Sequence, residues 1–469
     1  MTPKCAHILS GIAIFCLFTC HHKTQQNEER TYDFPELVAH GEITAATLNS
    51  SVSYFRYKGQ PMGYEYELIA DFARTHGLHL NIKIAENISQ LIEILQNGGA
   101  DVVAYPVKID NLAKEDVLFC GHEQQSSLVI VQHASHGDTL LTDVTQLIGK
   151  AIYVKPDTRY HERLENLNRE LGGGIRIMDI AEDTVTTEDL IGMVSRREIP
   201  YTVCEDNIAR LNQTYYRNIN IGLEISFKQR SSWVVRKSAP LLAEAINKWA
   251  SDNAGEKTYK TASKRYFELS KYPVDLKPQI IDGQISPYDH FFKQYAPLLG
   301  WDWQLLASVS WQESHFDPSA MAWSGARGLM GIMPETAAHL GFELPEMDEP
   351  EKNIQAGVEC LRRFGRRFVN VPDSLERIKL TLASYNAGLG HILDAQQLAE
   401  KYGRDPDVWS GSVNEFVRLK SEPKYYADSI CKYGYLRGAE TYNYVTEVFE
   451  RYEYYKQETA RTVAGKVRP

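Results

Sequence analysis

Hydrophobic and polar positions divide the chain into two halves with different periodicities. From about residue 36 to residue 270, short runs rich in β-branched residues alternate with segments whose apolar residues recur at helical spacing. The first set of alternating strands and helices is predicted at residues 42–48, 64–75, 78–84, 88–96 and 100–107. Alternation of this kind is typical of βαβ units, so we expect a largely parallel sheet.

A second set of predicted strands begins near Ser127. Its strands are expected at residues 128–131, 151–154 and 175–180, with helices after Pro156 and after Thr187. Two such sets in series predict an α/β domain with two lobes and a cleft between them, covering residues 36–270.

The second half of the chain has a helical pattern. Residues 271–287 are richer in proline, glycine and isolated polar residues and are interpreted as a linker. Helices are then predicted at 288–299, 303–314, 334–340, 354–368 and 375–385, with several more before Tyr455. We therefore expect a mainly helical domain over residues 288–456. The polar residues 457–469 are expected to form a flexible tail.

Composition limits the kinds of function that fit the chain. With 469 residues it is too long for one ordinary core, and roughly two to four domains are expected. A net charge of −10 and the lack of a Lys/Arg-rich run argue against binding to duplex nucleic acid. No P-loop, HExxH or paired CxxC motif occurs, so we expect neither a metal nor another cofactor.

The N-terminus has the pattern of an export signal. Apolar residues 8–18 are too few to span a bilayer and are interpreted as the hydrophobic core of a signal peptide covering residues 1–19. The end of this run, LFTC, resembles a lipobox, which would make Cys20 the acylated first residue of a lipoprotein. Simple secretion is the alternative. Residues 20–35 are polar and would form a tether, placing the protein on the outer membrane, facing the periplasm.

Four cysteines remain beyond Cys20, and an exported compartment would permit disulfides between them. They are Cys120, Cys204, Cys360 and Cys431. Their wide spacing makes buried free thiols an equal expectation, and none is a credible nucleophile.

Glu313 is the candidate catalytic residue. It lies at the end of a predicted helix, with Val309 and Leu306 at i−4 and i−7, so its carboxyl group shares the apolar stripe. A general acid needs a carboxyl group that keeps its proton, and apolar surroundings favour the protonated form. An ordinary solvated glutamate at a helix end is the alternative. Asp302 is a plausible N-cap of this helix, and Asp317-Pro318 would end it.

Four short motifs in the helical half resemble those of the lytic transglycosylases with a goose-lysozyme-like fold. Residues 313–318 (ESHFDP) resemble the ESxF(D/N)P signature, and residues 325–330 (GARGLM) follow it at the expected spacing. Residues 383–388 (ASYNAG) and 440–445 (ETYNYV) resemble two further segments of that family. The resemblance implies a lysozyme-like all-α domain.

The first half resembles the family 3 extracellular solute-binding proteins, which implies a periplasmic-binding-protein-like fold. Tyr54, Glu205 and Asp206 are candidates for its ligand cleft. Where amino-acid-binding members carry Thr-x-x-Arg, this chain reads NLAK at residues 111–114. Without the arginine fork we expect a peptide-containing ligand such as a muropeptide rather than a free amino acid. A cleft that serves only as a spacer is the alternative.

A solute-binding-like half followed by a transglycosylase half is the arrangement of the membrane-bound lytic murein transglycosylase F family. This resemblance implies that one glutamate, Glu313, cleaves the β-1,4 bond between N-acetylmuramic acid and N-acetylglucosamine in peptidoglycan glycan strands. Glu313 would first protonate the leaving oxygen. It would then take the proton of the muramyl C6 hydroxyl, giving a 1,6-anhydro sugar.

The same resemblance implies five substrate-binding candidates, which are Ser314, Met330, Tyr385, Asn386 and Tyr444. Each has a structural alternative as a helix cap or a core residue. Trp311, Phe316 and Trp323 are further candidates for stacking on sugar rings, although aromatic residues at helical spacing more often belong to a core.

One position departs from the family pattern. Many members have glutamine where this chain has Gly331, which removes an amide expected to bond to the substrate but leaves the acid in place. Two other functions stay open, a hydrolytic muramidase and a muropeptide sensor whose enzyme half is weak or inactive.

Overall fold

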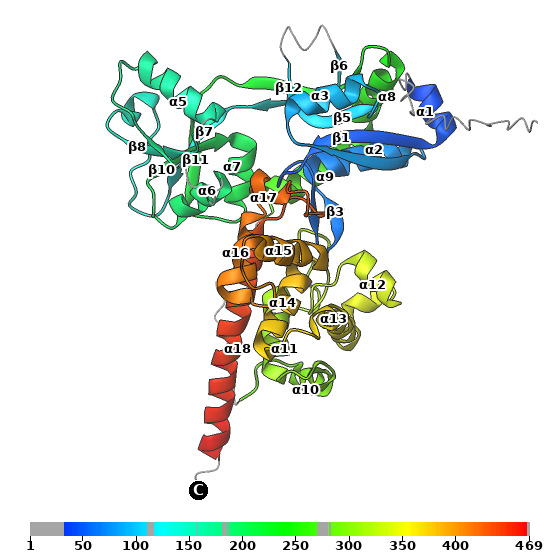
Figure 1. The fold of residues 1–469 in the computed structure, drawn as a ribbon, viewed down its shortest axis with the longest axis vertical. Coiled ribbons are helices and arrows are strands. Elements are labelled where there is room, and N and C mark those ends of the chain that lie inside the picture. Colours follow the sequence, from blue (N-terminus) through cyan, green and yellow to red (C-terminus); the bar gives the residue numbers. More distant parts are fainter. Residues whose placement is uncertain are drawn as a thin grey trace, which may run out of the picture.

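The chain forms a two-lobed α/β unit joined to a helical unit (Figure 1). The computed structural model describes residues 32–109, 117–156, 158–180, 187–269 and 283–466, together with residues 185 and 280. The predicted signal peptide, Cys20, nearly all of the tether, residues 111–114 and most of the predicted linker lie outside these ranges.

Lobe 1 is built from both ends of the first half of the chain. Its strands are β1 (Glu42–Leu48), β2 (Phe55–Tyr57), β3 (Gln60–Met62), β4 (His79–Ala85), β5 (Val102–Lys108), β6 (Val117–Ser126) and β12 (Gln229–Arg236). Its helices are α1 (Phe34–His40), α2 (Tyr64–Thr75), α3 (Ile88–Gln96), α8 (Pro240–Ser251) and α9 (Asn253–Phe267). Five strands form one sheet in the order β4-β1-β5-β12-β6, with a hydrophobic core on each face.

Lobe 2 is the insertion between β6 and β12. Its strands are β7 (Leu128–His133), β8 (Ala151–Val154), β9 (Arg176–Asp179), β10 (Tyr201–Glu205) and β11 (Ile219–Glu224). Its helices are η1 (Val144–Leu147), α5 (Arg159–Glu170), α6 (Thr187–Ser195) and α7 (Asp206–Gln213). The sheet order is β11-β7-β10-β8-β9, again with a core on each face.

The two lobes confirm the predicted α/β architecture, but the sheets are less parallel than expected. The neighbours β4-β1-β5 and β10-β8-β9 are parallel, whereas β12 and β7 pair antiparallel with both of their neighbours. The cause is the chain path. The chain leaves lobe 1 along β6 into β7 and returns along β11 into β12. These strands follow one another without an intervening crossover helix, and such a helix is what parallel pairing requires.

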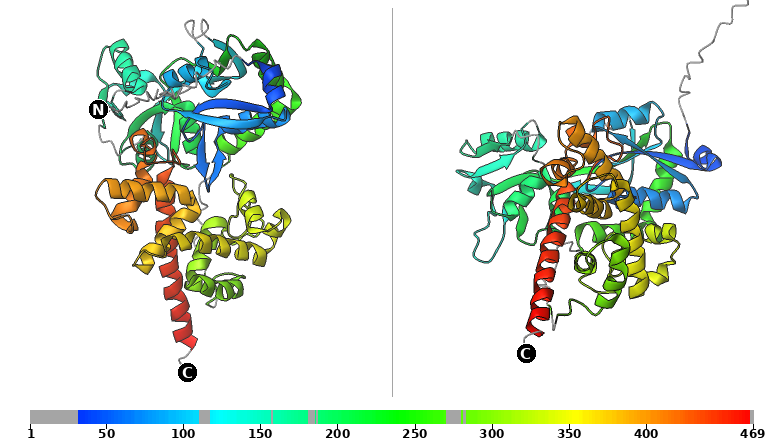
Figure 2. Two further views of the ribbon diagram at one scale, coloured as in Figure 1. Left: turned by 45° about the vertical axis from the view of Figure 1, so that its right-hand side comes forward. Right: turned by 60° about the horizontal axis from the view of Figure 1, so that its bottom comes forward.

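Strands β2 and β3 form a separate hairpin that the sequence pattern did not predict. The hairpin leaves lobe 1 and reaches toward the helical unit (Figures 1 and 2). Its two-residue turn has positive φ at both positions, 49° at Lys58 and 81° at Gly59. This is the type I′ geometry, which matches the twist of paired strands. The turn therefore holds the Lys58 side chain at the tip of a short, regular ribbon.

The second half of the chain is helical, as predicted. Its helices are α10 (Asp289–Tyr295), η2 (Ala296–Leu299), α11 (Trp303–Ser314), α12 (Pro334–Leu340), η3 (Leu344–Asp348), α13 (Pro350–Gly365), η4 (Arg366–Phe368), α14 (Ser374–Ala387), α15 (Leu389–Lys401), η5 (Trp409–Val413), α16 (Asn414–Leu419), α17 (Pro423–Tyr426) and α18 (Gly438–Lys466). One core cluster extends across them, from Ile285 to Tyr455.

Helix α18 corrects the expectation of a flexible tail after residue 456. It continues to Lys466, and Thr459 on it is 9% exposed and accepts a hydrogen bond from the Gln304 amide at 3.3 Å. Helix α11 packs against α18, and the Gln304 contact supports α18 at Thr459 despite the polar composition of this segment.

The four cysteines in the described part of the chain are free thiols, in line with the second of the two expectations. Cys120, Cys204 and Cys360 are buried and Cys431 is partly buried. Burial raises the pKa of the Cys431 thiol to about 11 and that of Cys360 to about 12. Neither is therefore reactive as a thiolate near neutral pH.

Glu188, at the start of α6, joins the two lobes to the helical unit. Its carboxylate accepts hydrogen bonds from Ser51 of lobe 1 and, at 3.0 Å, from Tyr435 of the helical unit. The Arg437 guanidinium lies 3.3 Å from the same carboxylate, stacks 3.7 Å from the Tyr215 ring centroid and donates to Asn212. Buried charge-assisted contacts of this kind define a preferred arrangement of the three bodies.

A buried ion pair supports the segment that reaches this junction. Lys420 is fully buried and donates to the Asp394 carboxylate, which also accepts the backbone N–H groups of Lys432 and Tyr433 at 3.0 and 2.9 Å. Asp394 therefore holds the loop that ends at Arg437.

Candidate active site

Glu313 occupies the last turn of α11, as predicted. Val309 and Leu306 on the same stripe are fully buried, and the Glu313 side chain is 9% exposed. The position of Glu313 in the sequence thus indicated correctly that its side chain is largely shielded from bulk solvent.

The chain reverses sharply after Glu313. His315 is the left-handed C-cap of α11, with φ 53°, and Phe316 follows with φ 64°. Two successive non-glycine residues in this region are uncommon and store backbone strain. The reversal brings residues 325–332 back across the end of α11, where Ser310 and Ser314 both donate to the Leu329 carbonyl, at 3.0 and 2.9 Å.

Tyr444 contacts the candidate acid directly. Its hydroxyl donates to Oε1 of Glu313 at 2.8 Å. Burial, together with the negative charge of Glu313, raises the pKa of Tyr444 well above its usual value. The phenol therefore keeps its proton and fixes one carboxylate oxygen in place.

Tyr385 and Asn386 lie at the C-terminal end of α14, on the same wall of the site. The Tyr385 hydroxyl donates to the Met330 carbonyl at 2.7 Å. The Asn386 amide oxygen accepts a hydrogen bond of 2.7 Å from Thr441 on α18. Residues from α11, α14, α18 and the 325–332 segment therefore converge, so the structure brings all four sequence motifs together.

Two of the predicted substrate contacts are directed into the protein instead. Ser314 is 6% exposed, and its hydroxyl donates to the Ser310 and Leu329 carbonyls. Met330 is fully buried, and its side chain packs against Gly357, where a Cβ would come within 2.7 Å of it. In this state both residues position the backbone around Glu313.

Asn353 on α13 is a site residue that sequence reasoning missed. It is fully buried, accepts the Met330 N–H at 2.7 Å and donates to the Arg327 and Met347 carbonyls at 3.0 and 2.9 Å. One amide thus satisfies two backbone groups of the 325–332 segment and one of η3, and ties the two together. A polar residue on an otherwise apolar helix face was the only signal in the sequence.

Lys58 is the second residue that sequence reasoning missed, and it comes from the other half of the chain. Its ammonium donates to Oε2 of Glu313 at 3.0 Å and to the Gly331 carbonyl at 3.3 Å. The Lys58 and Glu313 side chains are 8% and 9% exposed, so this is a buried ion pair between the two units. A lysine before a glycine in a short turn is typical of a solvated hairpin tip, which is why it was overlooked.

The hairpin is docked by backbone contacts as well. The Lys58 N–H donates to the Ala387 carbonyl at 3.2 Å, and the buried His391 ring contacts the Arg56 carbonyl at 3.1 Å. Gly388 passes so close that a Cβ there would lie 2.7 Å from the Gly59 nitrogen. The tip of the hairpin therefore fills the space in front of Glu313.

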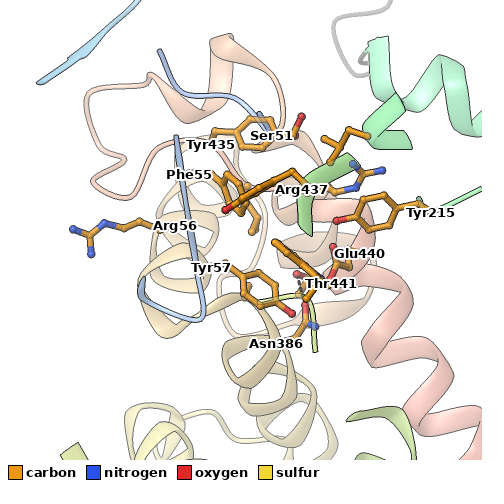
Figure 3. Close-up of a pocket in the computed structure, with 15 residues that line it drawn as sticks. Ser51, Phe55, Arg56, Tyr57, Tyr215, Asn386, Tyr435, Arg437, Glu440 and Thr441 are labelled. Carbon is orange, nitrogen blue, oxygen red and sulfur yellow. Dashed lines mark hydrogen bonds between the residues drawn. The ribbon is translucent and has the colours of Figure 1, made fainter. Parts of the chain in front are cut away.

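A small pocket lies beside the docked hairpin (Figure 3). Lobe 1, lobe 2 and the helical unit all contribute walls, including Tyr57, Tyr215, Trp323, Asn386 and Glu440. The Trp323 ring lies 5.5 Å from Tyr57 and 5.9 Å from Tyr266, so here it contacts the first half of the chain. Trp311 and Phe316 instead pack on each other at 5.4 Å, and Phe316 lies against the core.

The candidates for the solute cleft lie in different lobes. Tyr54 packs on Tyr66 at 5.5 Å within lobe 1. Glu205, at the end of β10 in lobe 2, pairs with Arg159 at the start of α5. Asp206 begins α7, and its Oδ1 is buried without a hydrogen-bond partner. Burial raises the pKa of Asp206.

Two family models match the chain, one in each half. Residues 43–269 match the bacterial extracellular solute-binding proteins, family 3, and residues 291–408 match the transglycosylase SLT domain. The chain is 34% identical over 426 residues to membrane-bound lytic murein transglycosylase F of Desulfosudis oleivorans, covering 90% of this chain and 91% of that one. It is 29% identical to the protein of the same name from Stutzerimonas stutzeri, covering 96% and 90% of the two chains.

The chain belongs to the membrane-bound lytic murein transglycosylase F family. Its two-lobed α/β unit is the solute-binding-protein-like module of that family, and its helical unit is the lysozyme-like transglycosylase domain. Among solved structures, the second substrate-binding domain of GlnP from Lactococcus lactis, in its open conformation, superposes with a TM-score of 0.41 and 17% identity over 49% of this chain and 96% of that one. Within the described ranges, no helix is both long and apolar enough to cross a bilayer.

The contact between Tyr444 and Glu313 yields a prediction for this family member. Changing Tyr444→Phe removes the donor to Oε1 and should lower kcat/KM on purified sacculi roughly ten- to hundredfold, as expected for a hydrogen bond to a charged group worth about 1.5–3 kcal/mol. Turbidity loss measures the rate.

Tyr452→Phe is the matched control, because Tyr452 lies on the same helix but bonds to Asp302, away from Glu313. Equal losses in the two variants, with equal losses in thermal stability, would show that the effect comes from helix packing and not from the acid.

Proposed function

We propose that this chain cleaves peptidoglycan glycan strands without water and leaves 1,6-anhydro-N-acetylmuramic acid ends. The observation that carries this proposal is the carboxyl group of Glu313, which is nearly buried and bonded to Tyr444 at the meeting point of four motifs. One residue can act first as acid and then as base, because the two proton transfers occur in sequence at the same place.

The first step breaks the glycosidic bond. Glu313 gives its proton to the oxygen that links the two sugars, the C1–O bond breaks, and N-acetylglucosamine leaves as an alcohol. The acetamido group of the muramyl residue stabilises the positive anomeric carbon. Tyr444 keeps Glu313 directed at this oxygen.

The second step closes the new ring. The Glu313 carboxylate takes the proton of the muramyl C6 hydroxyl while O6 forms a bond to C1. Glu313 regains the proton that it gave, and no water is consumed. Tyr385 and Asn386, on the wall beside Glu313, would bind the strand, and the tight packing of the 325–332 segment helps to exclude water from the anomeric carbon.

Analysis of digested sacculi tests this reaction. The chain should release products lighter by one water than those of a muramidase, and Glu313→Gln should release none above background. Sacculi are digested in parallel with the Lys58→Met variant, because the docked hairpin restricts access to Glu313. Hydrated reducing ends would favour the muramidase alternative. Equal release above background by wild type and Glu313→Gln would contradict the role of Glu313, and release by neither chain would favour the sensor function.

We further propose that the solute-binding-like module recognises cell-wall fragments. Arg159 stands at the N-terminus of α5, where a guanidinium and the helix dipole together suit a peptide carboxylate. Its present partner, Glu205, suits an ammonium group. Lobe closure on a ligand would act on Glu188, which belongs to lobe 2 and contacts both lobe 1 and the enzyme domain. Ligand binding and hairpin docking would therefore be coupled through one junction.

Calorimetric titration of the full-length Glu313→Gln chain checks the ligand class. A muropeptide that carries a stem peptide should bind, and free amino acids of the size of glycine to glutamate should not. Arg159→Ala should weaken the muropeptide at least roughly tenfold, the loss of one charge-assisted contact. Arg169→Ala, an exposed change at the other end of α5, is the control. Tight binding of a free amino acid would reverse the assignment.

Finally, we propose that Cys20 carries lipid and anchors the protein to the outer membrane. The support is the lipobox-like sequence LFTC after an apolar run too short to span a bilayer. Growth with a labelled fatty acid should label the wild-type chain and not Cys20→Ser. Cys16→Ser, within the same apolar run, should keep the label. An unlabelled wild-type chain in the soluble fraction would contradict the anchor.

A further inference from the structure

Gly331 lies directly under the carboxylate of Glu313. Its φ is +59°, and a Cβ placed on it would lie 2.2 Å from Oε2, 3.1 Å from Cδ and 3.3 Å from Cβ of Glu313. The carboxylate therefore occupies the space that any side chain at position 331 would need.

Gly331 contributes to the same contact in a second way. Its carbonyl accepts from Lys58 at 3.3 Å, while Oε2 of Glu313 accepts from Lys58 at 3.0 Å. The ammonium is thus held between two acceptors that are adjacent only because residue 331 has no side chain to keep them apart.

Both oxygens of the Glu313 carboxylate accept a hydrogen bond in this arrangement. Oε1 accepts from Tyr444 and Oε2 accepts from Lys58. The hairpin tip also fills the space in front of Glu313, where a glycan strand would have to bind. The other docking contacts of the hairpin are made by its backbone and by the Arg56 and Tyr57 side chains, which pack on Tyr433 and Trp323. Lys58 is the hairpin side chain that bonds to the reacting group.

We propose that Gly331 is the positioning residue that lets Lys58 capture Glu313. The missing side chain allows the carboxylate to lie over the Gly331 Cα and meet the ammonium. Any side chain at 331 moves the carboxylate away from Lys58 and loosens the docked hairpin. This proposal rests on the proposed function of Glu313.

A double-mutant cycle between Gly331 and Lys58 tests the proposal. Full-length chains carrying Gly331→Ala, Lys58→Met or both are compared with wild type for turbidity loss of sacculi. Amide deuterium exchange of the hairpin, residues 55–62, is measured on the same chains, because the Lys58 N–H is bonded to the Ala387 carbonyl only when the hairpin is docked.

In the chain that keeps Lys58, Gly331→Ala should speed hairpin exchange roughly fivefold, as expected when a contact worth about one hydrogen bond is lost. Turnover of each chain that carries Gly331→Ala is divided by turnover of its parent. This ratio should be roughly fivefold larger when the parent is wild type than when the parent is Lys58→Met. Any direct effect of position 331 on substrate binding occurs in both backgrounds and cancels.

Gly300→Ala is the matched control, since Gly300 has φ +67° and open space around the position of a Cβ. It imposes the same left-handed backbone on an L-residue without touching Glu313, so hairpin exchange should not change. If Gly331→Ala proves less stable than this control, Gly331→Asn is used, because asparagine tolerates left-handed conformations better than alanine.

Unchanged hairpin exchange, together with equal effects of Gly331→Ala in both backgrounds, would overturn the proposal. Faster exchange with no turnover in any variant would support the role of Gly331 and refute the proposed reaction. The failure of one is therefore distinguishable from the failure of the other.

Discussion

A carboxylate has two oxygens, and in this structure two modules each engage one of them. Tyr444, from the last helix of the enzyme domain, donates to Oε1, and Lys58, from the hairpin of the solute-binding-like module, donates to Oε2. A buried ion pair loses hydration on both sides, so it is retained where geometry and additional acceptors compensate, as the Gly331 carbonyl does here. The arrangement of the two halves of the chain depends on this contact and on the Glu188 junction.

The surroundings of Glu313 are held by backbone hydrogen bonds rather than by charge. Asn353 satisfies two main-chain groups of the facing segment and one of η3. Tyr385 satisfies a third group of that segment, and Ser310 and Ser314 share the Leu329 carbonyl. Buried polar groups that are all paired make a segment rigid, because breaking any of them leaves an unsatisfied group. This rigidity supports the strained reversal at His315 and Phe316.

The sequence allowed the fold class, the helical position of Glu313 and the convergence of four motifs to be predicted, because these follow from local periodicity and from short motifs such as ESHFDP. It did not predict the hairpin, Lys58 or Asn353. Lys58 and Glu313 are 255 positions apart, and nothing in the local pattern of a Tyr-Lys-Gly turn indicates what it will meet. Helix α18 was predicted too short, because a polar composition hides the packing that α11 supplies.

The hairpin that reaches the enzyme domain has a turn of only two residues, Lys58 and Gly59. The position of side chains in such a hairpin is sensitive to loop length, because inserting one residue turns every following side chain to the opposite face. A single insertion or deletion in this loop would therefore move the Lys58 ammonium away from Glu313 while leaving both modules folded. The rate of glycan cleavage before any ligand binds can thus differ between homologous chains because of the length of this loop alone. The residues that perform the reaction need not change.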